Sequence, residues 1–124
     1  MNRAALRKSV QQVVDQIVTL AHPRRVILFG SAAEGDAHAD SDLDFLVVVP
    51  ESERTDELTD RLNTQIRNRP MPCDFMVVTQ PVLDRNRDNP GLIYGDILER
   101  GRVVYAARNA GGGFRTRLVT ACAK

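Results

Sequence analysis

The sequence contains little of what would place it among several common classes of protein. Its 124 residues include only two cysteines, Cys73 and Cys122, and aromatic residues make up 5% of the chain, with no tryptophan. The two cysteines do not have the spacing of a metal-binding or thiol redox motif. We therefore expect a reduced protein, with the cytoplasm as its compartment.

The chain also lacks a strong net charge and any long apolar segment. Its formal net charge is +1, so no overall electrostatic field favours nucleic acid or an anionic membrane as a partner. The longest apolar run, Phe45 to Val49, is far too short to cross a bilayer. The segment from Arg61 to Arg69 is basic but lacks the interleaved aromatic residues of an RNA-binding surface. We expect neither membrane insertion nor direct nucleic-acid binding.

What the chain does contain is an ordinary globular balance, with 43% hydrophobic and 27% charged residues, at the length of one domain. Thr55 is a candidate N-cap and Gly101 a candidate C-terminal cap. The glycine run 111–113 predicts a flexible tail over residues 106–124. Periodicity and turn residues predict helices over residues 4–21, 55–69 and 89–100, and strands over residues 25–29, 42–49, 73–78 and 102–105.

Two carboxylates stand out in the second predicted strand. Because side chains alternate along a strand, Asp42 and Asp44 are expected on one face, with Leu43 and Phe45 directed into a core. The two carboxylates repel each other, and neither has a basic neighbour in sequence. A divalent cation such as Mg²⁺, which prefers oxygen ligands, would stabilise this pair.

Chain topology predicts that a third carboxylate, Asp74, joins them. The strand–helix–strand unit of residues 42–78 joins parallel strands, which begin at the same edge of a sheet. Asp74 is therefore expected near Asp42 and Asp44. Three carboxylates can hold two Mg²⁺ ions about 3.5–4 Å apart.

The pair Gly30-Ser31 ends the first predicted strand. If that strand runs antiparallel to the second, Gly30 and Ser31 reach the same edge as the carboxylates. Glycine lets a phosphate approach the backbone closely, and a serine hydroxyl with backbone N–H groups can hold phosphate oxygens.

Gly30-Ser31, followed after residues 32–41 by Asp42-Leu43-Asp44, resembles the signature of the polymerase-beta-like nucleotidyltransferases. The chain is similar to their shortest members, the minimal nucleotidyltransferase (MNT) proteins. The similarity extends from the first helix to about Tyr105 and includes Asp74. It implies an α/β (α+β) nucleotidyltransferase domain over residues 1–105, with a mixed sheet of about four strands flanked by helices.

The same resemblance implies a chemistry and a partner. ATP would be the donor, and a nucleoside monophosphate would be transferred to an acceptor hydroxyl. Gly30 and Ser31 would hold the triphosphate, Asp42 and Asp44 would bind two Mg²⁺ ions, and Asp74, a further metal ligand, would orient and deprotonate the acceptor. MNT proteins are typically encoded beside a helical HEPN protein, a candidate RNase toxin, and act as its antitoxin.

Three functional hypotheses follow. The leading one is an adenylyltransferase that modifies a hydroxyl, most simply a tyrosine, of a HEPN-type toxin. The second is an antitoxin that neutralises its toxin by binding alone. It is motivated by Glu34, which stands where many relatives have a basic residue in the phosphate loop. The third is transfer to a small molecule such as an aminoglycoside, against which the absence of a substrate domain counts.

The remaining polar residues near these motifs are interpreted as structural. Asp40 is read as a turn residue, His38 as a loop residue, His22 as a helix terminator and Cys73 as a core residue on the strand face opposite Asp74.

Overall fold

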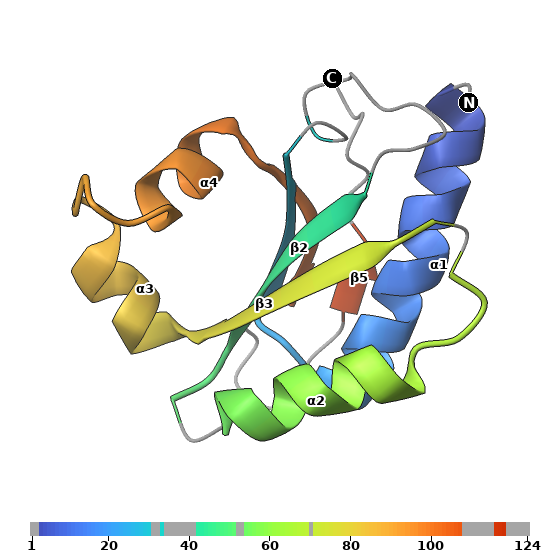
Figure 1. Ribbon diagram of the computed structural model, residues 1–124, viewed down its shortest axis with the longest axis horizontal. Coiled ribbons are helices and arrows are strands. Elements are labelled where there is room, and N and C mark those ends of the chain that lie inside the picture. The colour runs from blue at the N-terminus through green and yellow to red at the C-terminus, as the bar shows by residue number, and fades with distance from the viewer. Residues whose placement is uncertain are drawn as a thin grey trace.

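The computed structural model describes residues 3–30, 33, 42–51, 54–69, 71–107 and 116–118. These residues form a five-stranded sheet with helices on both faces (Figure 1). The helices are α1 (Arg3–Ala21), α2 (Thr55–Gln65), α3 (Gln80–Asn86) and α4 (Tyr94–Arg100). The strands are β1 (Arg25–Phe29), β2 (Leu43–Val49), β3 (Cys73–Thr79), β4 (Arg102–Ala107) and β5 (Thr116–Leu118), in the order β3-β2-β1-β4-β5 across the sheet.

The sheet separates two apolar clusters. On one face, α1 and α2 pack against alternate residues of β2, among them Leu43, Phe45 and Val47. On the other face, α3 and α4 pack against Leu46 and Val48. Because β2 is covered on both sides, its apolar run is continuous rather than alternating. Each fully buried side chain of this size contributes roughly 1.5–3 kcal/mol to folding.

The strand directions confirm the predicted mixed sheet. β1 pairs antiparallel with both β2 and β4, whereas β2 pairs parallel with β3. The helix α2 makes the crossover between β2 and β3, as the sequence predicts for a unit that joins parallel strands. The end of β1 and the starts of β2 and β3 therefore meet at one edge of the sheet.

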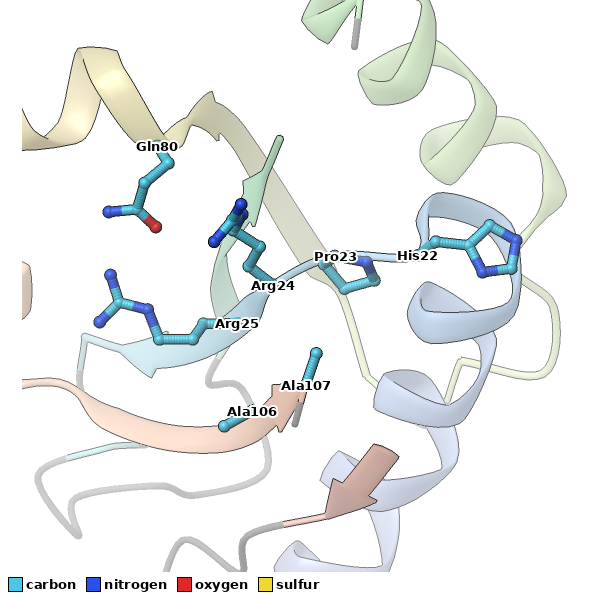
Figure 2. Close-up of a pocket in the computed structure, with 7 residues that line it drawn as sticks. All are labelled: His22, Pro23, Arg24, Arg25, Gln80, Ala106 and Ala107. Atoms are coloured by element: carbon cyan, nitrogen blue, oxygen red, sulfur yellow. The ribbon is translucent and has the colours of Figure 1, made fainter. Parts of the chain in front are cut away.

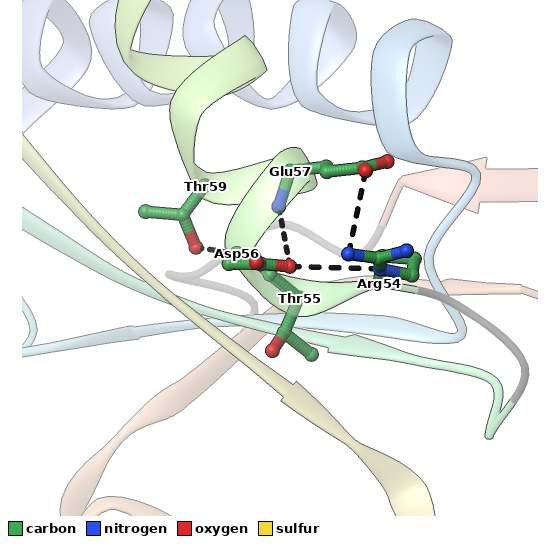
Figure 3. Close-up of polar contacts among 5 residues, drawn as sticks. All are labelled: Arg54, Thr55, Asp56, Glu57 and Thr59. Atoms are coloured by element: carbon green, nitrogen blue, oxygen red, sulfur yellow. Dashed lines mark hydrogen bonds and ion pairs between the residues drawn. The ribbon is translucent and has the colours of Figure 1, made fainter.

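The second predicted helix differs from the structure at its start. Thr55 was predicted as the N-cap, but it is the first helical residue, and Arg54 occupies the cap position without a side-chain cap hydrogen bond. Figure 3 shows how this end is stabilised instead. The carboxylate of Asp56 accepts a hydrogen bond from the backbone N–H of Glu57 at 2.9 Å, and the Arg54 guanidinium lies 3.6 Å from the Glu57 carboxylate. Two acidic residues in the first turn also complement the helix dipole.

The same helix ends at Gln65, four residues before the predicted end at residue 69. Ile66 leaves the helix in an extended conformation and is buried. The Arg69 guanidinium donates hydrogen bonds to the carbonyls of Leu62 and Asn63, at 3.2 and 2.6 Å. The Leu62 carbonyl also accepts the Ile66 N–H at 3.4 Å, whereas the Asn63 carbonyl is one that the helix terminus leaves without an intrahelical partner, so the Arg69 bond to Asn63 lets the chain leave the helix early.

The third predicted helix was placed too early, and one helix was missed. Asn89 and Pro90 do not start a helix, because the Asn89 side chain accepts a hydrogen bond from the N–H of Gly91 at 3.0 Å and forms a turn. The helix α4 begins at Tyr94. The missed helix α3 is only seven residues long, with Leu83 as its buried residue, and is too short to show a clear period.

The strand β4 extends to Ala107, and the short strand β5 pairs antiparallel with it. Both features lie in the segment for which the sequence predicts a flexible tail, and the fifth strand is additional to the four that were expected. Among the described residues, no helix has the length and apolarity needed to span a membrane.

Candidate active site

The sheet places Asp44 at the centre of the edge where the predicted site residues meet. In the strand register, Asp44 lies opposite Phe29 of β1 on one side and opposite Asp74 of β3 on the other. Directly opposed residues project from the same face of a sheet. The carboxylates of Asp44 and Asp74 therefore share a face, while Leu43 and Phe45 are buried on the opposite face.

The three carboxylates interact electrostatically. Asp44 is partly buried, whereas Asp42, which immediately precedes β2, and Asp74 are exposed. Burial raises the pKa of Asp44 above its ordinary value, and the charges of Asp74 and Asp42 and a hydrogen bond to Asp74 raise it further. A carboxylate with a raised pKa is less stable in its charged form. The arrangement therefore favours a positive charge or a proton at this edge.

Gly30 directly abuts this cluster. Its φ is +83°, in the left-handed region that favours glycine. A Cβ added at this position would lie 2.5 Å from the Asp44 Oδ2 atom. The close approach of the backbone to this carboxylate is therefore a second reason for glycine at position 30. The backbone at the end of β1 thus approaches the Asp44 carboxylate with no side chain between them. Ser31, together with Glu34, His38 and Asp40, lies outside the described residues.

Arg102 holds Ala33, three residues after Gly30. Its Nε donates a hydrogen bond to the Ala33 carbonyl at 2.5 Å, and the Ala33 N–H donates to the Gly30 carbonyl at 3.1 Å. Ala33 itself is buried in the cluster beneath α1 and α2. No local sequence pattern points to Arg102, because the contact joins residues 69 positions apart.

Cys73 is excluded as a reactive group of this site. It is buried on the sheet face opposite Asp74, and its Sγ lies in hydrogen-bonding range of the Met71 carbonyl, at 3.3 Å. Burial, against the opposing effect of Arg69, raises the pKa of the Cys73 thiol to about 11, and the carboxylates of Asp74, Asp42 and Asp44 add to this increase. At neutral pH the group is a protonated core residue, as its sequence position predicted.

The chemistry of the donor set at this edge fits a hard divalent cation. Asp42, Asp44 and Asp74 offer carboxylate oxygens, which Mg²⁺ prefers, and their mutual repulsion would be relieved by a cation. Over the described ranges, no three His, Cys, Asp or Glu side chains are spaced closely enough to form a metal site as they stand. Binding would therefore draw the carboxylates closer together than they lie in this structure.

These features define the chain as an α+β domain with an acidic site at one edge of a mixed sheet. Residues 8–104 match the nucleotidyltransferase domain family, and the chain belongs to that family. It is a transferase by family, and its general chemistry is nucleotidyl transfer.

A solved structure supports the fold. The chain is similar to a candidate nucleotidyltransferase from Sulfolobus solfataricus, with a TM-score of 0.54 and 19% sequence identity over 90% of this chain and 87% of that chain. At this identity the likeness concerns the fold alone. No curated protein matches the chain.

Proposed function

We propose that this chain is a Mg²⁺-dependent adenylyltransferase that transfers AMP from ATP to a hydroxyl of a partner protein. The observation that supports it is the contact of Gly30 with Asp44, with Asp74 directly opposite in the register. This arrangement sets a backbone without a side chain, available for phosphate binding, beside the acidic groups that a metal-bound triphosphate requires.

The proposed reaction is an in-line substitution at the α-phosphorus of ATP. The acceptor oxygen forms a new bond to this phosphorus while the bond to the bridging oxygen of the β-phosphate breaks, and pyrophosphate leaves with that electron pair. Asp74 orients the acceptor hydroxyl and accepts its proton. Asp42, Asp44 and Asp74 would hold Mg²⁺, which supplies Lewis-acid polarisation of the phosphate oxygens when bound. Gly30 and Ser31 would hold the triphosphate.

The sheet edge that carries Asp42, Asp44 and Asp74 is called the acidic edge below. Its exposure favours a protein as the acceptor. Asp74 and Asp42 are exposed, and β3 forms an edge of the sheet. A hydroxyl presented by a large partner can reach an open site of this kind, whereas a small acceptor is usually held in an enclosed pocket. The resemblance to MNT proteins suggests that the partner is a HEPN-type toxin, that the acceptor is a tyrosine and that the chain acts as an antitoxin.

The direct test is to measure intact masses. Purified chain, ATP and Mg²⁺ are incubated with the product of the neighbouring gene, the place where the resemblance implies a HEPN-type partner, and the masses of both proteins are recorded. We expect the partner to gain whole AMP units, and this gain to disappear with Asp74→Asn. The control is Asp60→Asn, which removes one exposed carboxylate from α2 and should leave the transfer unchanged. A partner that binds tightly and gains no mass would contradict the proposal.

Glu34 favours a second candidate, neutralisation by binding alone. A carboxylate in the phosphate loop opposes an anionic triphosphate, so the chain could retain the fold of a transferase and inhibit its toxin by occlusion. Neutralisation of the toxin in cells that survives Asp42→Asn would favour this reading, and loss of neutralisation would exclude it. AMP transfer to an aminoglycoside without any partner would instead favour the small-molecule acceptor.

Arg102 should act as a positioning residue for the nucleotide. Replacing Arg102 by methionine removes the hydrogen bond that holds the Ala33 carbonyl, three residues after Gly30. We expect the KM for ATP to rise about tenfold with kcat changed by less than about twofold, because a lost charge-assisted hydrogen bond weakens ground-state and transition-state binding alike. Steady-state kinetics at varied ATP concentrations would measure both constants.

The matched control is Arg100→Met, two residues before Arg102, which removes an exposed guanidinium that pairs with the Asp96 carboxylate. This variant should leave the KM for ATP unchanged. An equal rise in the KM for ATP in both variants would show that the loss of one positive charge alone weakens ATP binding. The proposed positioning role of Arg102 would then be wrong.

A further inference from the structure

A pocket lies at the end of the sheet opposite the carboxylates, where β1 begins and β4 ends (Figure 2). Its volume is about 450 Å³, within the range of small-molecule sites. Arg24 and Arg25 line it from the start of β1, Gln80 from the start of α3, and Ala106 and Ala107 from the end of β4. The five residues of β1 separate it from Gly30, a distance of roughly 15 Å at the rise of a strand.

The backbone around this pocket is held firmly by hydrogen bonds. The Arg24 N–H donates to the Val48 carbonyl at 2.7 Å, and the Arg24 carbonyl accepts from the Ala107 N–H at 2.8 Å. Arg25 is paired in register with Val48 on one side and with Ala106 on the other. Ala106, opposite Arg25 in the register, has a small side chain and leaves open the space into which a larger residue would project.

The pocket concentrates positive charge. Figure 2 shows the guanidinium groups of Arg24 and Arg25 and the amide of Gln80 directed into the same space, with the His22 ring turned away from it. Within the described part of the chain, neither guanidinium forms an ion pair or a side-chain hydrogen bond. Two guanidinium groups that line one pocket repel each other, and an anion bound between them would relieve this repulsion. The positive charge of its lining therefore favours the binding of an anion in this pocket.

The nearby Asp84 carboxylate does not neutralise the guanidinium groups of Arg24 and Arg25. The Asp84 carboxylate accepts a hydrogen bond from Gln80 Nε2 at 2.9 Å and pairs with the Arg87 guanidinium at 3.2 Å. Because the Gln80 nitrogen is engaged by Asp84, its side-chain oxygen is left as an acceptor toward the pocket. The lining thus combines two arginine guanidinium groups, the neutral acceptor oxygen of Gln80 and small apolar surfaces. These surfaces belong to Pro23, Ala106 and Ala107.

We propose that this pocket binds a small phosphate monoester, with the guanidinium groups of Arg24 and Arg25 on the phosphate. Planar guanidinium groups match phosphate oxygens in bidentate geometry, and a phosphate monoester carries close to the two negative charges that two arginines neutralise. Gln80 accepts a hydrogen bond from a hydroxyl or amino group of the ester. The inference does not depend on the proposed transfer reaction, because none of its residues belongs to the acidic edge.

The test is a titration of the ¹⁵N-labelled full chain, followed by the shifts of its backbone amide signals. EDTA is present throughout so that Mg²⁺-dependent binding of nucleotide at the acidic edge does not contribute. Inorganic phosphate, glucose 6-phosphate and AMP serve as separate probes, which distinguishes the bare anion, a sugar phosphate and a nucleotide. We expect saturable shifts centred on Arg24, Arg25, Ala106 and Ala107, with an ester bound more tightly than inorganic phosphate.

Three variants make the result specific. Arg25→Ala should weaken binding about tenfold, as expected when a charge-assisted contact worth about 1.4 kcal/mol is lost. Ala106→Leu should weaken it by a similar factor without any change of charge, because the larger side chain fills the pocket. Arg67→Ala removes an exposed guanidinium before β3 and should leave the affinity unchanged.

Two outcomes would overturn the proposal. Equal weakening by Arg67→Ala and Arg25→Ala would show that only the overall charge attracts the anion. Shifts confined to Gly30, Asp44 and their neighbours would show that the ester binds at the acidic edge instead. Thermal unfolding of each variant without ligand checks that it remains folded.

Discussion

Asp44→Asn is expected to abolish AMP transfer while it stabilises the metal-free protein. Transfer should fall by about 10³-fold or more, because metal-assisted stabilisation of the transition state contributes several kcal/mol and each 1.36 kcal/mol changes a rate tenfold. The melting temperature in EDTA at pH 7 should rise by about 2–4 °C, a modest gain because solvent partly screens this site. Intact-mass measurement and thermal unfolding would test the two effects.

The sign of the stability change follows from the pKa of Asp44. Burial and the carboxylates of Asp74 and Asp42 raise this pKa above 3.8 in the folded protein. Stability from protonated Asp44 is therefore fully present below pH 3.8 and is lost as the pH rises through the folded pKa. The D44N variant does not undergo this loss, so its advantage should grow above pH 3.8 and vanish below it.

The same variant should respond weakly to metal. Mg²⁺ should raise the melting temperature of the unaltered chain, because a ligand that binds only the folded state stabilises it, and should raise that of D44N less. Asp60→Asn, the exposed control, should keep both transfer and the metal response. Equal Mg²⁺ stabilisation of the unaltered chain and D44N would contradict the assignment of Asp44 as a metal ligand.

Gly30→Ala is expected to cause the second large effect. The added methyl group would lie 2.5 Å from the Asp44 Oδ2 atom, at a residue whose φ is +83°. We expect a loss of about 2 kcal/mol in the free energy of unfolding, from backbone strain and displacement of the carboxylate together. Transfer should fall about 10²-fold, the usual cost of misplacing a reacting group by about 1 Å. Denaturant unfolding and transfer rates would measure both losses.

A double-mutant cycle would separate the two causes of this instability. In an Asp44→Ala background the methyl group meets no carboxylate, so Gly30→Ala should cost only the backbone strain of roughly 1 kcal/mol. Gly91→Ala serves as the control, because its Cβ would meet only the Asn89 side chain, at 3.4 Å, and its φ is not positive. Additive losses from Gly30→Ala and Asp44→Ala would show that the predicted contact does not exist in solution.

Much of the site's layout could be predicted from local patterns. The alternation of side chains places Leu43 and Phe45 in the core and Asp44 on the opposite face, and the structure confirms both burials. The rule that a helical crossover joins parallel strands predicts that Asp74 lies beside Asp44, and the register places them directly opposite each other. The role of these residues in binding metal and substrate stays a prediction.

The predictions that were wrong concern the ends of helices and the elements that are too short to show a clear period. The end of α2 is decided by the hydrogen bonds of Arg69 to Leu62 and Asn63, which depend on how the following chain folds back. The turn at Asn89 is decided by one side-chain hydrogen bond, where the sequence equally allowed a helix start. These outcomes depend on small differences in energy between local alternatives, which residue patterns do not resolve.

The sequence by itself determined the four main strands and the parallel pairing of β2 with β3, which sets Asp74 beside Asp44, because these follow from side-chain alternation and the helical crossover. The antiparallel direction of β1 stayed a condition, and the mixed sheet was implied by the family resemblance. Only the tertiary structure decided that Gly30 touches Asp44, that Arg102 holds Ala33 and that two guanidinium groups share a pocket with Ala106. Each of these contacts joins different strands or distant loops. Their geometry depends on strand register and on helix packing over the sheet, which are set by the whole core and not by any local run of residues.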